Sequence, residues 1–190
     1  MTVYIPGPDD VLKYLEERES IQREFDKVIQ MSNDLGYVMD LCGLEFAAAS
    51  YGTKIQSWLQ NKYGWRNIAA SLNKGDFSTA TRNNIELKCS IIKKGDKANL
   101  LNLRLDTPVM DYLFIIRSMR KKMTKIFFVP KENVQYMVDT YKEGSYDKHK
   151  GIHANIRVSI NSIVWEKDPD LNLWSNLHQY EISEDDLSTL

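Results

Sequence analysis

The sequence predicts a mixed α/β domain in which a mixed β-sheet is flanked by helices. Apolar residues recur at helical spacing through the first third of the chain, then alternate strictly over one strand-length segment, and then form two continuous runs. Helices, a hairpin and buried strands in this order are typical of a layered α/β architecture. The length of 190 residues suits one domain of good size, or one domain with a helical appendage.

Two helical segments open the chain. Residues 9–32 carry apolar side chains near helical spacing, and the Asn-Asp-Leu-Gly stretch at 33–36 ends that pattern. A second helical stretch runs from about Tyr37 to Asn61. The segment around Gly52 is expected to divide it, because glycine is costly inside a helix.

The middle of the chain changes to the two-residue period of β-strands. From Ile85 to Ile92, apolar residues alternate with Glu86, Lys88 and Ser90. The turn residues Gly95 and Asp96 follow, so we expect a hairpin with a returning strand at 100–105. The other expected elements are buried strands at 112–116 and 126–130, a helix at 131–141, and late strands at 156–160 and 163–165.

These elements give three expected parts: an N-terminal helical segment at 1–36 packed on the core, a core at 37–180, and a loose acidic tail at 181–190. No apolar run is long enough to span a bilayer, so we expect no membrane partner. Cys42 and Cys89 are expected to be buried free thiols, which favours a cytoplasmic location.

The charge is distributed unevenly along the chain. Residues 1–50 hold 4 Lys or Arg against 10 Asp or Glu, residues 51–160 hold 20 against 9, and residues 161–190 hold 1 against 7. The basic middle favours a polyanion such as a nucleic acid as partner, unless the acidic ends pack against it and neutralise it. The candidate DNA-contacting residues are Lys93, Lys94, Lys97, Arg104, Arg117, Arg120, Lys121, Lys122, Lys125, Lys148 and Lys150.

The candidate chemistry lies on the alternating strand. Glu86 and Lys88 are two residues apart and therefore share a face, while Asp76 precedes Glu86 by ten residues and could fold back beside it. Two carboxylates and the backbone carbonyl of Leu87 would supply the oxygen ligands that Mg²⁺ prefers. Lys88 would orient or deprotonate a water, or neutralise developing charge. The alternative is a cross-strand ion pair on a solvated sheet face.

The stretches Gly75-Asp76-Phe77 and Ile85-Glu86-Leu87-Lys88 resemble the PD-(D/E)XK nuclease motif, although Gly75 stands where the motif name has proline. The resemblance covers about residues 41–130. It is closest to type II restriction endonucleases and also extends to the mismatch-repair nicking endonuclease. It implies a restriction-endonuclease-like core and a further carboxylate, Glu45, on the preceding helix.

The resemblance implies a Mg²⁺-dependent endonuclease that cuts double-stranded DNA at specific sequences. Asp76 and Glu86 would hold the metal, and Lys88 would act on the water. Such enzymes commonly act as homodimers, because two sites cut the two strands of a symmetric sequence. The helix at 9–32 would then form the dimer contact or a DNA clamp. A non-catalytic nucleic-acid-binding module, and an RNA or repair nuclease on the same core, are the alternatives.

Overall fold

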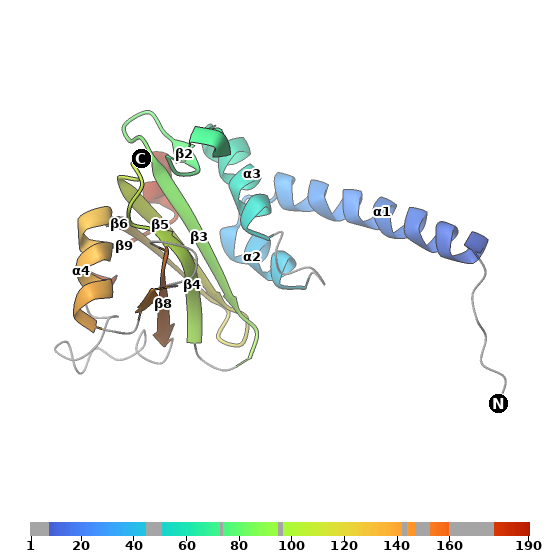
Figure 1. Ribbon diagram of the computed structural model, residues 1–190. Coiled ribbons are helices and arrows are strands. Elements are labelled where there is room, and N and C mark those ends of the chain that lie inside the picture. Colours follow the sequence, from blue (N-terminus) through green and yellow to red (C-terminus); the bar gives the residue numbers. More distant parts are fainter. Residues whose placement is uncertain are drawn as a thin grey trace.

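The structure is a computed structural model that describes residues 8–44, 51–72, 74–94, 97–141, 144–146, 153–159 and 177–190. It confirms the expected mixed α/β class. A six-stranded mixed sheet carries helices on its faces, and a smaller sheet lies against it (Figure 1). No helix in the described part of the chain has both the length and the apolar character needed to cross a bilayer.

The described residues form four α-helices and two short 3-10 helices. They are α1 (Pro8–Met31), α2 (Leu35–Leu44), α3 (Tyr51–Tyr63), η1 (Ala70–Leu72), α4 (Lys131–Tyr141) and η3 (Asp185–Ser188). The predicted second helical stretch is described as α2 and α3, and residues 45–50 between them lie outside the described ranges. Gly52, which was expected to divide the stretch, lies in the first turn of α3. Helix α2 begins at Leu35 because Asp34 caps it: its Oδ1 accepts the backbone N–H of Tyr37 at 2.8 Å.

The main sheet has the order β1-β2-β3-β5-β6-β9. Its strands are β1 (Arg66–Asn67), β2 (Phe77–Ser78), β3 (Ile85–Ile92), β5 (Asp111–Ser118), β6 (Met123–Pro130) and β9 (Glu181–Ile182). Strands β3 and β5 are parallel, and the other neighbours are antiparallel. The smaller sheet has the order β4-β8-β7, from β4 (Lys97–Arg104), β8 (His153–Ser159) and β7 (Gly144–Tyr146).

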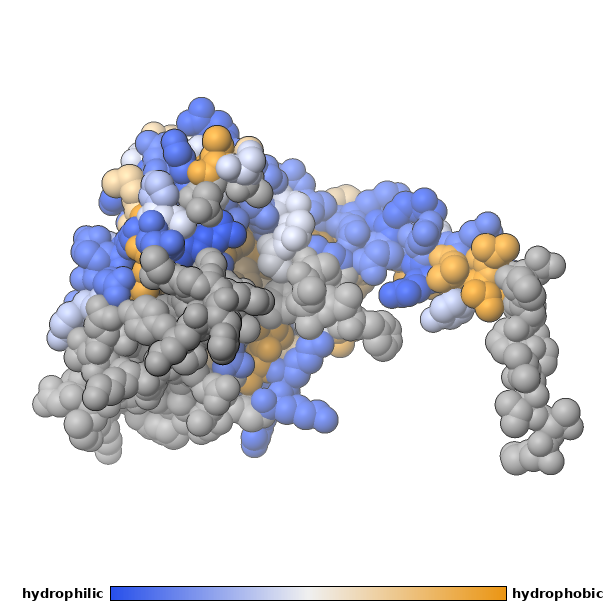
Figure 2. Space-filling model, in the orientation of Figure 1, coloured by the Kyte–Doolittle hydropathy of each residue, from blue (hydrophilic) through white to orange (hydrophobic). Residues whose placement is uncertain are grey.

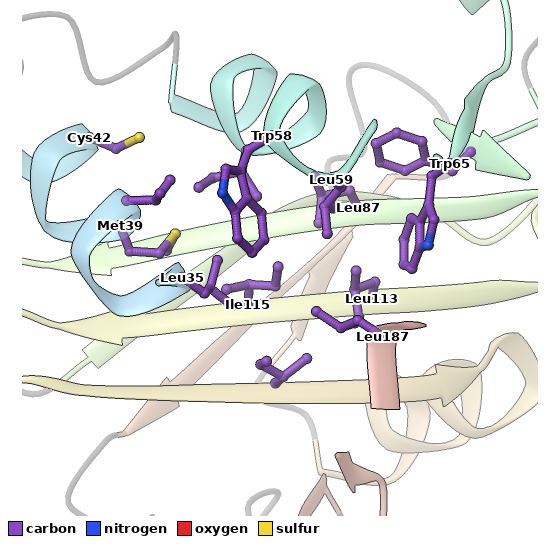
Figure 3. Packing of buried hydrophobic residues seen from close by; sticks show 14 of the residues in the cluster. Leu35, Met39, Cys42, Trp58, Leu59, Trp65, Leu87, Leu113, Ile115 and Leu187 are labelled. Atoms are coloured by element: carbon purple, nitrogen blue, oxygen red, sulfur yellow. The ribbon is translucent and has the colours of Figure 1, made fainter. Parts of the chain in front are cut away.

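One face of the main sheet is covered by α2 and α3. Trp58 and Leu59 of α3 and Met39 of α2 pack against Leu87 of β3 and Leu113 of β5 (Figure 3). Trp58 also donates its indole N–H to the carbonyl of Ser32 at 2.8 Å, which satisfies the only polar atom of the buried ring. The odd-numbered residues of β3 therefore face the helices, as the alternation predicted.

The opposite face of the main sheet packs against the smaller sheet and α4. Tyr112, Phe114 and Ile116 of β5 contact a second core that includes Leu100 and Leu103 of β4. Strand β5 is buried along all of its length because it lies between the two cores. This confirms the sequence expectation of a central strand covered on both faces.

The predicted hairpin between residues 85–92 and 100–105 is wrong in its pairing. Strand β4 returns alongside β3, but in the described residues it pairs with β8, and the sheet neighbour of β3 is β5. The β4 amide of Asn99 instead donates to the hydroxyl of Ser90 at 3.2 Å. Strand β4 therefore lies over the face that carries Glu86 and Lys88.

The acidic tail is also corrected, because it is not loose. Leu187 is fully buried in the helix-side core, and β9 pairs with β6. Glu184 accepts the backbone N–H of Leu35 and pairs with Lys62 at 2.6 Å. The buried Leu187 and these contacts hold residues 181–190 on the core, although their acidic composition suggested a loose tail. The expected late strand at 163–165 lies outside the described residues.

Helix α1 packs on the core only near its C-terminal end. Ile29 is fully buried, Phe25 is partly buried, and Asp26 pairs with Lys54 of α3. Residues 11–24 are all exposed, and the helix projects away from the rest of the molecule (Figure 1). The expectation that the whole N-terminal segment packs on the core therefore holds for its last turns alone.

Candidate functional site

Glu86 and Lys88 leave β3 on the face opposite the helices, as the strand alternation predicted. The Glu86 side chain is only 3% exposed, and its Oε1 lies 2.7 Å from Nζ of Lys88, whose side chain is 17% exposed. A solvated sheet face is therefore excluded for this pair, because the smaller sheet covers it. Oε2 of Glu86 is buried and has no hydrogen-bond partner among the described residues.

Asp76 folds back beside the start of β3. Its amide donates to the carbonyl of Ile85 at 2.7 Å, and its Oδ2 accepts the amide of Leu87 at 2.8 Å. Gly75 makes this approach feasible: its φ is +99°, and a Cβ there would lie 2.7 Å from the Ile85 carbonyl oxygen. The residue that departs from the proline of the motif name is thus required by the local backbone.

The Leu87 backbone adds a third oxygen to this place. Within a strand the N–H and C=O of one residue point to the same side, and the Leu87 N–H points at Asp76. Its carbonyl is therefore directed to the edge where Asp76 lies. Strand β2 pairs with β3 only through Phe77 and Ile85, so no β2 residue occupies this edge at Leu87.

Two further side chains surround Glu86. Nε of Arg104, from β4, lies 3.8 Å from its Oε1. Tyr112 is beside Glu86 in the parallel β3–β5 register, and its buried hydroxyl has no hydrogen-bond partner among the described residues. The sequence placed Arg104 among DNA contacts and did not single out Tyr112, because both positions depend on pairings between distant strands.

Burial and charge act together at this site. Burial raises the pKa of Asp76, and the nearby charge of Glu86 raises it further, while the Leu87 amide, Lys88 and Arg104 act in the opposite direction. Burial and the Glu86 charge likewise raise the pKa of the Tyr112 hydroxyl. Two acids held this close in a covered site favour a cation between them.

The described residues contain no group of three or more His, Cys, Asp or Glu side chains placed to hold a metal ion. The two carboxylates that meet here are Asp76 and Glu86. The predicted third carboxylate, Glu45, lies outside the described residues. The site thus has two carboxylates and a backbone carbonyl as its candidate oxygen ligands.

Several bases of the middle segment are neutralised by the acidic ends, which was the alternative to a DNA partner. Arg117 is buried and makes a two-bond ion pair with Asp40 of α2 at 2.6 and 2.9 Å. This corrects its expected role, since its guanidinium holds α2 on the sheet. Lys125 pairs with Glu181 of β9. Both bases belong to the packing of the fold and not to an exposed basic surface.

Five other bases gather at the opposite end of the sheet from Glu86. Lys93 and Lys94 follow β3, and the turn after β5 carries the others, with Met119 N–H bonded to the carbonyl of Ile92. The exposed set, here called the basic tip, is Lys93, Lys94, Arg120, Lys121 and Lys122. Lys93, its nearest member along β3, is seven positions beyond Glu86, which corresponds to roughly 23 Å of extended strand. Lys148, Lys150 and the side chain of Lys97 lie outside the described residues.

Cys42 is buried as a free thiol, as expected, and Cys89 is a partly exposed free thiol on β3. Comparison with known proteins gives no family: no family model matches the chain, and no curated protein matches it. The fold and the geometry of the site therefore carry the functional argument on their own.

Proposed function

We propose that the chain is a Mg²⁺-dependent endonuclease that hydrolyses phosphodiester bonds in double-stranded DNA, as a sequence-specific type II restriction enzyme with a restriction-endonuclease-like core. The observation that carries the proposal is the fixed pair of Asp76 and Glu86 beside Lys88. A purely structural ion pair would use both oxygens of a buried carboxylate. Oε2 of Glu86 instead lies buried without a hydrogen-bond partner among the described residues, which suits a ligand.

The oxygen set fits a hard divalent cation. Mg²⁺ is commonly held by one or two carboxylates, with water and substrate phosphate completing its shell. Asp76, Glu86 and the Leu87 carbonyl would hold it. Once bound, the ion would supply Lewis-acid stabilisation of the phosphoryl oxygens and a more acidic bound water.

The protein residues have separate tasks in this proposal. The Leu87 amide fixes the orientation of Asp76 through the bond to its Oδ2. Lys88 is held by Glu86 on a rigid strand, where its ammonium would orient the attacking water or bind a phosphate oxygen. Arg104 lies on the next layer and would neutralise charge that develops on the phosphate.

The basic tip would bind the DNA backbone away from the chemistry. Its distance of roughly 23 Å from Glu86 corresponds to about seven nucleotides of B-form strand at about 3.4 Å each. A homodimer would let two copies cut the two strands of a symmetric site.

The test is cleavage of supercoiled plasmid with Mg²⁺, followed by sequencing of the ends. Glu86→Gln and Lys88→Met are expected to reduce cleavage by about 10²-fold or more while DNA binding persists. Glu132→Gln, an exposed carboxylate in the first turn of α4, is the matched control and should cut like the wild type. The proposal fails if the wild type does not cut with Mg²⁺ or Mn²⁺, or if both site variants still cut.

Metal binding gives a readout that does not depend on activity. Calorimetry with Mn²⁺ should detect a site in the wild type and in Glu132→Gln, and its loss in Asp76→Asn and Glu86→Gln. Discrete DNA ends would support restriction, whereas ragged ends would favour a repair or general nuclease.

A non-catalytic nucleic-acid-binding module is the second candidate, and the basic tip is the observation that favours it. It requires DNA binding that Glu86→Gln and Lys88→Met leave intact and no cleavage by the wild type. Reversing the charge of Lys94 and Lys122 should weaken DNA binding under either function. The cleavage assay therefore decides between them.

A further inference from the structure

Helix α1 presents an apolar stripe that the described part of the molecule leaves exposed except at Phe25, which is partly buried against the core. Val11, Tyr14, Ile21 and Val28 are 45, 64, 70 and 44% exposed. Figure 2 shows apolar surface towards the far end of the projecting helix. Because residues 11–24 are exposed throughout, this half of α1 packs against no other described part of the chain, and an isolated helix of that length is marginal in water.

The stripe has the spacing of a helix–helix seam. Val11, Tyr14, Arg18, Ile21, Phe25 and Val28 follow one another at intervals of three and four residues, as the a and d positions of a heptad do. The helix spans Pro8–Met31 and is about 36 Å long. The seam therefore continues along most of its length.

The spacing of the stripe residues is the same from either end of the helix. Its positions are symmetric about the point between residues 19 and 20, which is also the midpoint of α1. When two copies of the helix run antiparallel about that point, Val11 faces Val28, Tyr14 faces Phe25, and Arg18 faces Ile21. A seam that matches its own reverse is the self-complementary surface that a two-fold dimer requires.

The polar residues select the antiparallel orientation. In a parallel pair the two Arg18 side chains would occupy one layer, and their like charges would repel. In the antiparallel pair each Arg18 lies against Ile21 and at nearly the same height as Gln22 of the other helix, whose amide oxygen can accept from the guanidinium. The position of Arg18 thus favours the antiparallel pair over the parallel one.

We propose that α1 is the self-association surface of this protein, and that two copies of the chain pair through antiparallel α1 helices centred between residues 19 and 20. The partner is a second copy of this chain. This inference stands on the stripe alone and does not depend on the proposed nuclease activity.

Sedimentation equilibrium of the full chain tests the proposal. The wild type should have twice the 22.1 kDa chain mass. Ile21→Glu should have the mass of one chain, because it places a charge in the seam. Ser20→Glu adds the same charge one position away, off the stripe, and should remain a dimer. A monomeric wild type, or an Ile21→Glu variant that remains a dimer, would overturn the proposal.

Crosslinking tests the orientation independently of stability. Val11→Cys and Val28→Cys variants should form a disulfide-linked heterodimer when mixed under oxidising conditions, and neither should link efficiently to itself. A parallel pair would give the opposite pattern, with each variant linking to itself, and would refute the antiparallel arrangement. Circular dichroism of each variant confirms that the fold is retained.

Discussion

Replacing Gly75 with alanine tests the backbone geometry that places Asp76, without removing any functional group. Gly75 has a φ of +99°, beyond the left-handed helical region that other residues visit, and a Cβ would lie 2.7 Å from the Ile85 carbonyl oxygen. The backbone must shift, and the shift strains or breaks two bonds, from the Asp76 amide to Ile85 and from the Leu87 amide to Asp76.

The expected cost follows from these parts. Backbone strain at such a φ costs about 1–3 kcal/mol, a neutral hydrogen bond contributes about 1 kcal/mol, and a bond to a carboxylate about 1.5–3 kcal/mol. Since the two bonds need not be lost completely, we expect Gly75→Ala to lower the free energy of unfolding by about 3–5 kcal/mol.

Gly64→Ala is the matched control. Gly64 ends α3 with a φ of +70°, its amide bonds to the Gln60 carbonyl, and a Cβ there would meet nothing within 4 Å. Left-handed strain of about 1–2 kcal/mol is partly offset by the stiffer unfolded chain, so its net cost is about 1 kcal/mol.

Urea unfolding followed by tryptophan fluorescence measures both variants. A difference of about 3 kcal/mol corresponds to about 1–2 M in the unfolding midpoint at a typical slope of about 2 kcal/mol per M. If Gly75→Ala unfolds within about 1 kcal/mol of Gly64→Ala, the reasoning about the tight approach at Ile85 is refuted.

Three further predictions concern the packing around the site. Asp40→Ala should lower the free energy of unfolding by about 3–5 kcal/mol because it leaves the buried Arg117 charge without its partner, whereas Arg117→Met should lower it by about 1–2 kcal/mol because the Asp40 side chain is 31% exposed. Equal losses for the two variants in urea unfolding would contradict this order. Trp58→Phe should lower the free energy of unfolding by about 2–3 kcal/mol, since it removes ring volume and leaves the Ser32 carbonyl without its donor. A thermal unfolding midpoint equal to that of the wild type would contradict a stabilising role for the Trp58 ring and its hydrogen bond. Burial raises the pKa of the Cys42 thiol from 9.0 to about 11, so the stability that the protonated thiol contributes is present below pH 9 and is lost as the pH rises to 11. The difference in free energy of unfolding between wild type and Cys42→Ala should therefore narrow by about 2–3 kcal/mol over that range, and a constant difference would contradict the prediction.

The local features of the fold could be predicted from the sequence because they depend on residues that are close together in the chain. The alternation in β3 correctly predicted that Glu86 and Lys88 share a face, and the continuous apolar run at 112–116 correctly predicted a strand buried on both sides.

The features that the sequence could not provide depend on distant pairings. Glu86 is buried because β4 pairs with β8 and covers it, and no local pattern encodes that pairing. Arg117 looked like part of a basic run, but its partner Asp40 is 77 residues away. The return of Asp76 to Leu87 needed the unusual backbone of Gly75, which the sequence marked only as a departure from a motif.

The packing of the segment at 181–190 has a consequence for the order of events during synthesis. Leu187 completes the core behind β3, and Glu184 bonds to the start of α2 and to α3, so the helix layer lacks these contacts while only the earlier residues have emerged. Domains fold as they are made, from the N-terminus onward. A ribosome-bound chain in which this segment has not yet emerged therefore holds Asp76 and Glu86 on an incompletely supported sheet, and their final alignment waits for residues 184–187.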